Sequence, residues 1–246
     1  MKLITCNIWC GIKYEQLEAF LKKQAFDTDI FCFQEVRNGK YHNPNSVSEE
    51  IAELFSQLQT ILPEFKGYFT EMVPGVGIAS FVRNNISVDK IESTQILSAQ
   101  DLSDLKMPNG DSYYPRMLQS VYLKDKNLTI QNFHGVPGNL KKDTPTRNIQ
   151  TDNLLKIINS NNDSQILVGD FNLDINTEAV TRLGERMNNL IKGSGFKATR
   201  NANYNQFETL PFADYIFTTP EIEVQEFLVL PDEVSDHLPL SLKFNL

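Results

Sequence analysis

Polar side chains that suit metal binding and proton transfer stand at the ends of the apolar runs of this sequence. They are carboxylates, amides and imidazoles: Asn7, Glu35, His134, Asp170 with Asn172, Asp214, and Asp236 with His237. A charge buried at a strand end is costly unless it is paired or binds a cation. If these ends converge in the fold, their oxygen and imidazole groups would line one rim suited to Mg²⁺ or Mn²⁺.

The clearest of these positions follows the apolar run within residues 165–172. The run does not alternate, which predicts a strand buried on both faces. Gly169 permits a tight turn at its end, so Asp170 and Asn172, two positions apart, are expected to point the same way. Taken alone, the pattern is equally typical of an Asx-rich turn in which both side chains bond nearby backbone N–H groups.

Histidine is scarce, and two of the three histidines stand at these positions. The chain has only His42, His134 and His237. A zinc site would call for more His or Cys ligands than the chain offers, so Mg²⁺ or Mn²⁺ is favoured. Individual candidates also fit structural alternatives. Asn7 is compatible with an ordinary strand-end amide, and Asp214 with a carboxylate that supports the backbone of the following residue.

Length and composition predict one domain over residues 1–246, because the chain is 41% hydrophobic and no segment lacks apolar residues. The formal net charge of -8 opposes long-range attraction to nucleic acid or to an anionic membrane. Cys6, Cys10 and Cys32 lack CxxC spacing and predict buried free thiols. With no membrane-length apolar run and a strand expected from residue 2, we expect a soluble cytoplasmic protein, assumed monomeric.

Periodicity predicts strands interleaved with four helices. The helices are expected at residues 14–25, at 46–62 with Ser46 and Glu49 as a capping box, from Thr144-Pro145 onward, and at 177–191. The strands are expected at 2–9, 29–33, 66–73, 77–82, 86–97, 116–123, 128–133, 165–168, 196–200, 214–218, 221–230 and 238–244. This order predicts two sheets packed face to face with helices outside.

The sequence resembles the endonuclease/exonuclease/phosphatase superfamily, the deoxyribonuclease I-like fold, over essentially its full length. The resemblance lies in short segments that follow one another in family order: TCNIW, FQEV, GVGIAS, NFHG, RNIQ, VGDFN, ADYIF and SDHLPL. It implies an α/β protein, a four-layered α/β/β/α sandwich of two mixed β-sheets flanked by helices. It also implies an Mg²⁺- or Mn²⁺-dependent hydrolase of phosphate esters with its active site at one end of the sandwich.

The resemblance assigns roles to ligands of the metal and of the substrate phosphate. Glu35 would be the principal metal ligand, with Asn7 and Asp236 near the metal. Asn172 would hold a phosphate oxygen. Arg116 resembles a phosphate-contacting arginine of some members.

The other implied roles concern proton transfer. Asp170 would orient or activate the attacking water, and His237, oriented by Asp214, would act as general base or transition-state stabiliser. His134 would assist the leaving group or contact the phosphate. These residue types suit ester hydrolysis, which needs in-line attack by water, charge neutralisation and protonation of the leaving oxygen.

Within the superfamily we expect a nuclease-type phosphodiester hydrolase. The alternatives are a phosphatase of inositol phosphate or another small phosphorylated substrate, a sphingomyelinase-like hydrolase, and an inactive binding or scaffold protein. Loops 37–47, 100–115 and 135–145 would select the substrate: Tyr113 and Tyr114 suit stacking on a base or sugar, and the last loop carries Lys141 and Lys142. Nucleic acid is a candidate partner, although the net charge opposes tight duplex binding.

Overall fold

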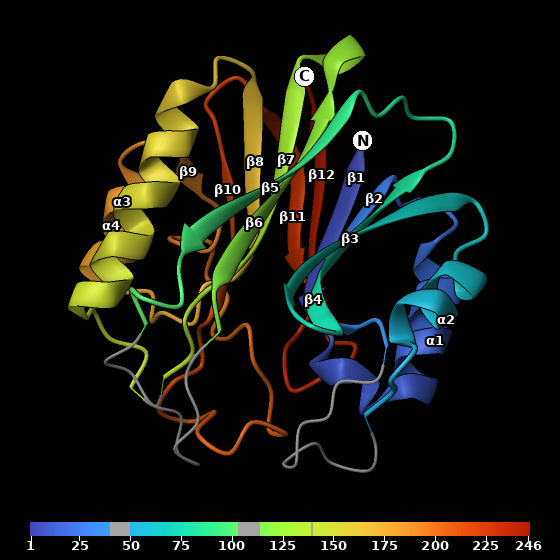
Figure 1. Cartoon of the computed structure of the whole chain (residues 1–246), viewed down its shortest axis with the longest axis horizontal. Helices are drawn as coiled ribbons and strands as arrows, with labels where there is room; N and C mark the ends of the chain where they lie inside the picture. Colours follow the sequence, from blue (N-terminus) through green and yellow to red (C-terminus); the bar gives the residue numbers. More distant parts are fainter. Residues whose placement is uncertain (40–49, 103–113, 139) are drawn as a thin grey trace.

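Two six-stranded β-sheets pack face to face in the computed structural model, which describes residues 1–39, 50–102, 114–138 and 140–246 (Figure 1). The first sheet has the order β11 (Glu223–Val229), β12 (Leu240–Asn245), β1 (Lys2–Asn7), β2 (Ile30–Arg37), β4 (Val76–Arg83) and β3 (Phe65–Val73). The second has the order β5 (Lys90–Leu97), β6 (Arg116–Leu123), β7 (Leu128–His134), β8 (Ser164–Asp170), β10 (Asp214–Thr218) and β9 (Asn188–Asn189).

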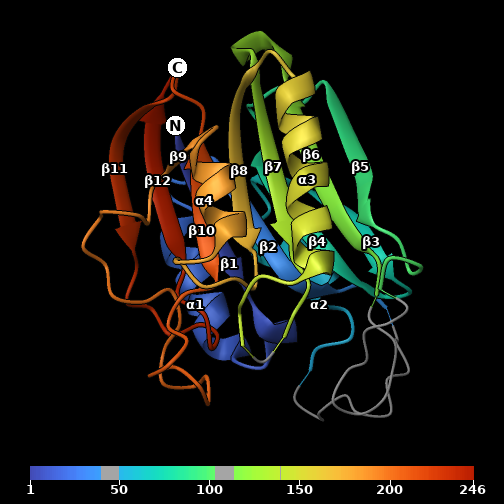
Figure 2. The same ribbon diagram turned by 90° about the vertical axis from the view of Figure 1, so that its left-hand side faces the viewer.

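Two helices cover the outer face of each sheet. α1 (Tyr14–Gln24) and α2 (Leu54–Ile61) lie on the first sheet, and α3 (Pro145–Ser160) and α4 (Glu178–Gly184) on the second; Figure 2 shows this second pair in front of β8 and β7. The expected four-layered α/β/β/α sandwich of two mixed sheets is therefore confirmed. Within the described ranges, every helix falls short of the length and apolar character that a membrane span requires.

The central strands are apolar on both faces because each face meets a different layer. In β2, Phe31 and Phe33 pack with the residues of α1 and α2, whereas Ile30 and Cys32 join the core that contains the second sheet. All four side chains are fully buried. Burial of a large apolar side chain contributes about 1.5–3 kcal/mol, which explains why a non-alternating run is stable here.

Parallel strand pairs, one in each sheet, bring the predicted site residues to one end of the sandwich. β1 and β2 are parallel, and so are β7 and β8, so the carboxyl ends of each pair share an edge. These ends carry Asn7, Glu35, His134 and Asp170. β10 is antiparallel to β8 and begins at the same edge, where Asp214 pairs with Asp170. Strand direction and the packing of the two sheets thus gather residues separated by more than two hundred positions.

A buried polar bridge fixes one sheet against the other just behind this edge. The Gln34 amide nitrogen donates to the side-chain oxygen of Asn132 at 2.7 Å, which joins β2 to β7. Asn132 in turn donates to the carbonyl oxygens of Phe33 at 3.2 Å and Ala79 at 3.1 Å. Buried hydrogen bonds of this kind, here made by both the oxygen and the amide nitrogen of Asn132, favour one relative placement of the sheets. They therefore fix the two halves of the site relative to each other.

The helix expected at residues 46–62 is wrong at its start, because α2 begins only at Leu54. The preceding backbone is bonded elsewhere: the Ile51 N–H donates to the carbonyl oxygen of Cys10 at 3.0 Å. That contact ties residues 50–53 to the short 3-10 helix η1 (Trp9–Gly11) instead of to a helical turn. The expected capping residues Ser46 and Glu49 lie outside the described residues.

Two further expectations are wrong near the C-terminal third of the chain. The helix expected at 177–191 ends at Gly184, a poor helix former, and the chain continues into β9, which pairs with β10. The strand expected at 196–200 is a loop with a single bridge between Arg200 and His237, because the Thr199 and Arg200 N–H groups both donate to the carbonyl oxygen of Pro211. The other expected elements are present, with ends shifted by a few residues.

Gly169 is required where β8 passes β7. Its φ is +138°, and an added Cβ would lie 1.9 Å from the carbonyl oxygen of Phe133. Because the clash is with backbone, Gly169→Ala is expected to lower the free energy of unfolding by roughly 3 kcal/mol. Gly184→Ala is the matched control, since its Cβ would meet no atom closer than 3.8 Å. Urea denaturation measures both, and equal stability of the two variants would contradict the prediction.

Candidate active site

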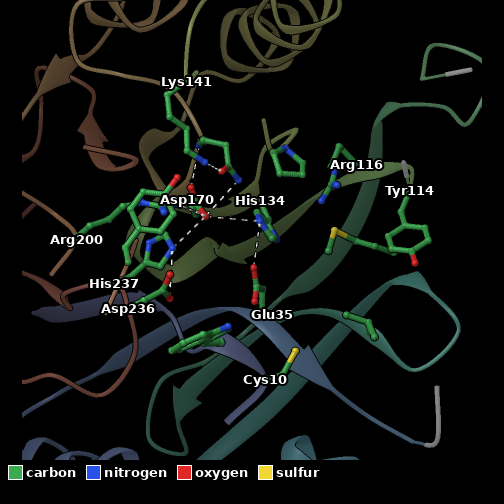
Figure 3. A pocket seen from close by; sticks show the side chains of 16 residues that line it. Cys10, Glu35, Tyr114, Arg116, His134, Lys141, Asp170, Arg200, Asp236 and His237 are labelled. Atoms are coloured by element: carbon green, nitrogen blue, oxygen red, sulfur yellow. Dashed lines mark hydrogen bonds and ion pairs between the residues drawn. The ribbon is translucent and has the colours of Figure 1, made fainter. Parts of the chain in front are cut away.

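A pocket of about 350 Å³ opens at the edge where the strand ends meet (Figure 3). The predicted residues that line it are Glu35, Arg116, His134, Asp170, Asn172, Asp236 and His237. The two other predicted residues contact this set from behind: Asn7 bonds Glu35, and Asp214 bonds His237. The structure therefore brings all of the predicted site residues together in one place.

The Asp170 carboxylate lies at the centre of the pocket wall and is held by two amides. Its Oδ1 accepts the backbone N–H of Asn172 at 2.8 Å, and its Oδ2 accepts the side-chain amide of Asn7 at 3.1 Å. Asn172 has a φ of +57°, which turns the backbone at the strand end. This turn combines the two interpretations of the sequence, because it is an Asx turn that also presents a carboxylate to the pocket.

Two imidazoles and a guanidinium surround the same carboxylate. The Nε2 atoms of His134 and His237 lie 3.6 Å and 3.7 Å from Asp170 Oδ2, and the guanidinium of Arg200 lies 4.0 Å away. Burial acts to raise the pKa of Asp170, but the nearby cationic groups, His237 foremost, outweigh it and hold the pKa below its usual range. Asp170 is therefore ionised at neutral pH.

His237 is paired with Asp214 in the arrangement of a catalytic dyad. His237 Nδ1 lies 2.9 Å from both oxygens of the Asp214 carboxylate, and Thr199 donates to Asp214 Oδ2 at 2.9 Å. Burial acts to lower the pKa of His237, but Asp214, assisted by Asp170, outweighs it and raises the pKa to about 9. The dyad thus fixes the ring orientation and leaves Nε2 facing the pocket.

His134 faces Asp170 and Glu35 across the pocket with different electrostatics. Its Nε2 lies 3.9 Å from Glu35 Oε1, and burial lowers its pKa to about 3. His134 is therefore neutral near pH 7, unlike His237. Its Nδ1 is buried and has no hydrogen-bond partner among the described residues. The two histidines consequently offer one neutral and one protonated imidazole to the same space.

Glu35 reaches the pocket through an irregularity in β2. The β2–β4 register shifts between Phe33 and Val36, and Glu35 adopts a φ of +55°, rare for a residue with a side chain. Its carboxylate accepts the amide of Asn7 at 3.0 Å, and the side chain is 32% exposed. Burial, followed by the charge of Asp236, raises the pKa of Glu35 despite the Asn7 hydrogen bond. The local charge thus favours a cation beside Glu35.

The donor set around Glu35 fits a hard divalent metal. Carboxylate oxygens from Glu35 and Asp236 face the pocket, as Mg²⁺ or Mn²⁺ requires. The side-chain oxygen of Asn7 accepts the Trp9 N–H at 3.0 Å, so its amide nitrogen is the group that faces the carboxylates. Asn7 therefore orients Glu35. Asp170, Asp214 and His237 also lie within 4.8 Å, but the mutual pairing of the last two favours a proton-transfer role for them.

Lys141 and Arg200 line the pocket although the sequence did not mark them as site residues. The sequence distinguishes Lys141 only as one of two adjacent loop lysines, and it predicts that Arg200 lies in a strand. The helix α3 holds the loop that carries Lys141: Arg147 donates to the carbonyl oxygens of Lys142 at 2.6 Å and Val136 at 3.1 Å. No local pattern separates such loop cations from surface ones, so only the packing of the loops reveals them.

Apolar and aromatic groups form much of the remaining wall. Trp9, Cys10, Met72, Val76 and Tyr114 contribute to it. Cys10 was expected to be buried like the other cysteines, but it is half-buried and borders the pocket near Glu35 (Figure 3). Tyr114 lies at the end of the pocket away from Lys141 and Arg200, on the side that also carries Arg116. Tyr113 lies outside the described residues.

Several solved structures share this fold. Bacteroides thetaiotaomicron VPI-5482 mannosyl-6-phosphatase Bt3783 superposes with a TM-score of 0.75 at 17% identity, covering 100% of both chains. The human Nocturnin catalytic domain with bound sulfate gives 0.64 at 19%, covering 100% of this chain and 93% of that one. Humanized D. rerio TDP2 gives 0.64 at 14%, covering 100% and 99%.

Comparison of sequences identifies the family directly. No match was found among curated protein sequences. The family model described as Endonuclease/Exonuclease/phosphatase family matches residues 4–237, a span that includes every predicted site residue. The sequence motifs, the two-sheet sandwich and the pocket agree with that match. The chain therefore belongs to the endonuclease/exonuclease/phosphatase family, whose members are hydrolases acting on phosphate esters.

Proposed function

We propose that this chain is an Mg²⁺- or Mn²⁺-dependent phosphoesterase in which a positioned water attacks the phosphorus. The observation that carries the proposal is the convergence on Asp170: a buried, ionised carboxylate within 3.6–3.7 Å of two imidazoles and beside a carboxylate cluster. Both sheets contribute to this arrangement. We accordingly treat residues 1–246 as one catalytic domain.

Glu35 and Asp236 would hold the divalent cation, with Asn7 orienting Glu35. When bound, such an ion supplies positive charge that polarises the phosphoryl group and neutralises its oxygens. Without it, Glu35 is buried near the charges of Asp236 and Asp170, which is consistent with the raised pKa of Glu35. The oxygen-rich donor set favours Mg²⁺ or Mn²⁺ over zinc.

The side chains of this pocket suit the other requirements of hydrolysis. Asp170 is ionised and accepts hydrogen bonds, so it would orient the attacking water and take up its proton. His237, with a pKa of about 9, would donate Nε2–H to the phosphoryl oxygens as negative charge develops. His134 is neutral and would donate a hydrogen bond to the phosphate or the leaving oxygen.

Asp214→Asn is expected to lower kcat about 100-fold or more with a smaller change in KM. Asparagine can present its amide to His237 Nδ1 and so favours the wrong ring tautomer and removes the charge that keeps the imidazole protonated. Steady-state kinetics at several pH values measure the effect. Asp125→Asn, an exposed carboxylate in the 3-10 helix η2 (Lys124–Lys126), is the matched control. A kcat unchanged by Asp214→Asn would remove the dyad from the mechanism.

The size and lining of the pocket bear on the substrate class. A nuclease-type phosphodiester hydrolase is supported by Trp9 and Tyr114, whose rings suit a base or sugar. The net charge of -8 and the pocket of about 350 Å³ instead favour a small phosphorylated molecule over a long polyanion. The small-substrate phosphatase is therefore the function that the described pocket supports best, and the nuclease-type activity is the second candidate.

A substrate screen tests the proposal. Purified protein with Mg²⁺ or Mn²⁺ would be assayed against 4-nitrophenyl phosphate, bis(4-nitrophenyl) phosphate, single- and double-stranded DNA, RNA, inositol phosphates and sphingomyelin. We expect hydrolysis of at least one small ester that a chelator abolishes and the divalent ion restores. No metal-dependent hydrolysis of any substrate would favour the inactive scaffold alternative.

A further inference from the structure

Two buried cations and an aromatic ring lie together at one end of the pocket. Lys141 is 4% exposed, has a φ of +48°, and donates from Nζ to the side-chain oxygen of Asn172. Arg200 is 3% exposed, and its guanidinium carbon lies 3.8 Å from the centroid of the Tyr204 ring. Lys141 Nζ lies 5.9 Å from the same ring centroid. We refer to Lys141, Arg200 and Tyr204 as the cationic end.

Among the described residues, the cations of this end are paired with carboxylates only loosely. Asp170 is the nearest carboxylate, 4.0 Å from the Arg200 guanidinium, and it is already shared with His134 and His237. Arg200 Nε is buried with no hydrogen-bond partner among the described residues. A buried cation without full compensation is costly, so the arrangement is stabilised when an anion enters.

The backbone of Lys141 points to the same conclusion. A left-handed φ at a lysine costs free energy, and here it directs the ammonium group into the pocket instead of toward solvent. The next residue, Lys142, is exposed and does not line the pocket. The stacking of Arg200 on Tyr204 likewise holds a guanidinium with its edge free to bond oxygens.

We propose that the cationic end binds the terminal oxygens of a phosphate monoester and so selects monoesters over diesters in the hydrolysis proposed above. This inference rests on that proposed function. A monoester carries about -1.5 to -2 charge at pH 7 and three terminal oxygens, whereas a diester carries one charge and two such oxygens. A diester would place its second ester group against Lys141 and Arg200 and leave them partly unpaired. The organic group of a monoester would extend away from Lys141 and Arg200, toward Tyr114.

The loss of the Lys141 proton at high pH gives a second measurable property of the same subsite. Burial lowers its pKa to about 8, aided by the cations Arg200 and Arg147, while Asp170 and Asp214 act in the opposite direction. Lys141 is charged below that pH and neutral above it. The affinity for a monoester should therefore fall as the pH rises through about 8, which appears as a fall in kcat/KM.

Lys141→Met tests the subsite, with Lys142→Met as the matched control. We expect Lys141→Met to lower kcat/KM for 4-nitrophenyl phosphate about 10- to 100-fold, because a charge-assisted hydrogen bond is lost. For bis(4-nitrophenyl) phosphate, kcat/KM should fall less than about 3-fold. The decline of monoester kcat/KM near pH 8 should move in this variant to about pH 9, where His237 loses its proton. Lys142→Met should match the wild type in all respects. Arg200→Gln provides an independent second variant with the same expected selectivity.

Binding without turnover separates this inference from the proposed function. Calorimetric titration of the metal-free protein with inorganic phosphate should show binding that weakens about 10-fold in Lys141→Met and is unchanged in Lys142→Met. If phosphate binds in this pattern but no ester is hydrolysed, the proposed function fails and the subsite stands. Equal losses for monoester and diester would show that Lys141 acts only by positioning Asn172, and would overturn the inference. Phosphate affinity that is the same in both variants would overturn it as well.

Discussion

Asp170→Asn is expected to reduce kcat at least about 1,000-fold while the protein still folds cooperatively. The substitution keeps the shape of the side chain, and its oxygen can still accept the Asn172 N–H that Asp170 accepts at 2.8 Å. What disappears is the buried negative charge that faces both imidazoles and the attacking water. Loss of a general base together with the charge that balances a protonated histidine accounts for an effect of this size.

Single-turnover kinetics with the most active substrate of the screen would measure this effect. Asp163→Asn is the matched control: Asp163 directly precedes β8, at the end of the strand away from Asp170, and accepts a hydrogen bond from Thr129 at 3.0 Å. Circular dichroism and urea denaturation would establish that both variants are folded. Turnover of Asp170→Asn within about 10-fold of the wild type would refute the role assigned to this carboxylate.

Glu35→Gln is expected to remove metal dependence as well as activity. The variant should lose at least about 100-fold in kcat/KM at a fixed Mg²⁺ or Mn²⁺ concentration, because one charged oxygen ligand is replaced by a neutral amide. The metal-free protein should not be destabilised. The carboxylates of Glu35, Asp170 and Asp236 crowd one pocket, so removal of one charge relieves repulsion in the absence of a cation.

Thermal unfolding distinguishes these two effects without any assay of activity. In the wild type, addition of Mn²⁺ after chelator should raise Tm, because a ligand that binds only the folded state stabilises it. In Glu35→Gln the same addition should change Tm little, whereas Glu64→Gln, an exposed carboxylate before β3, should respond like the wild type. An equal Tm rise in Glu35→Gln and the wild type would place the metal elsewhere.

The fold and the predicted site residues were accessible from sequence because their signals are local. The apolar run before Asp170 and the Thr144 N-cap each depend on a few neighbouring residues, and the structure confirms both. The turn expected at Gly169 is wrong, because Gly169 lies within β8 and the backbone turns at Asn172, whose φ is +57°. The short family motifs occur in a fixed order, which identified the sandwich and predicted which residues meet at its end. A strand end that interrupts its apolar run with a carboxylate is therefore informative even before its partners are known.

Tertiary structure decided the features that these local signals do not determine. The start of α2 and the loop at 196–200 depend on backbone hydrogen bonds to distant segments, which no local pattern records. The orientation of the Asn7 amide, the φ of +55° at Glu35, and the entry of Lys141 and Arg200 into the pocket likewise arise from packing between segments far apart in the chain.

The sequence by itself thus determined which candidate catalytic groups exist and at which strand ends they stand. The packing of loops against those strands decided the charge around them and the substrate that this charge would favour. The physical reason is range: periodicity, turns and caps act over a few residues, whereas the electrostatics of a buried pocket sum over every group that the fold brings near it.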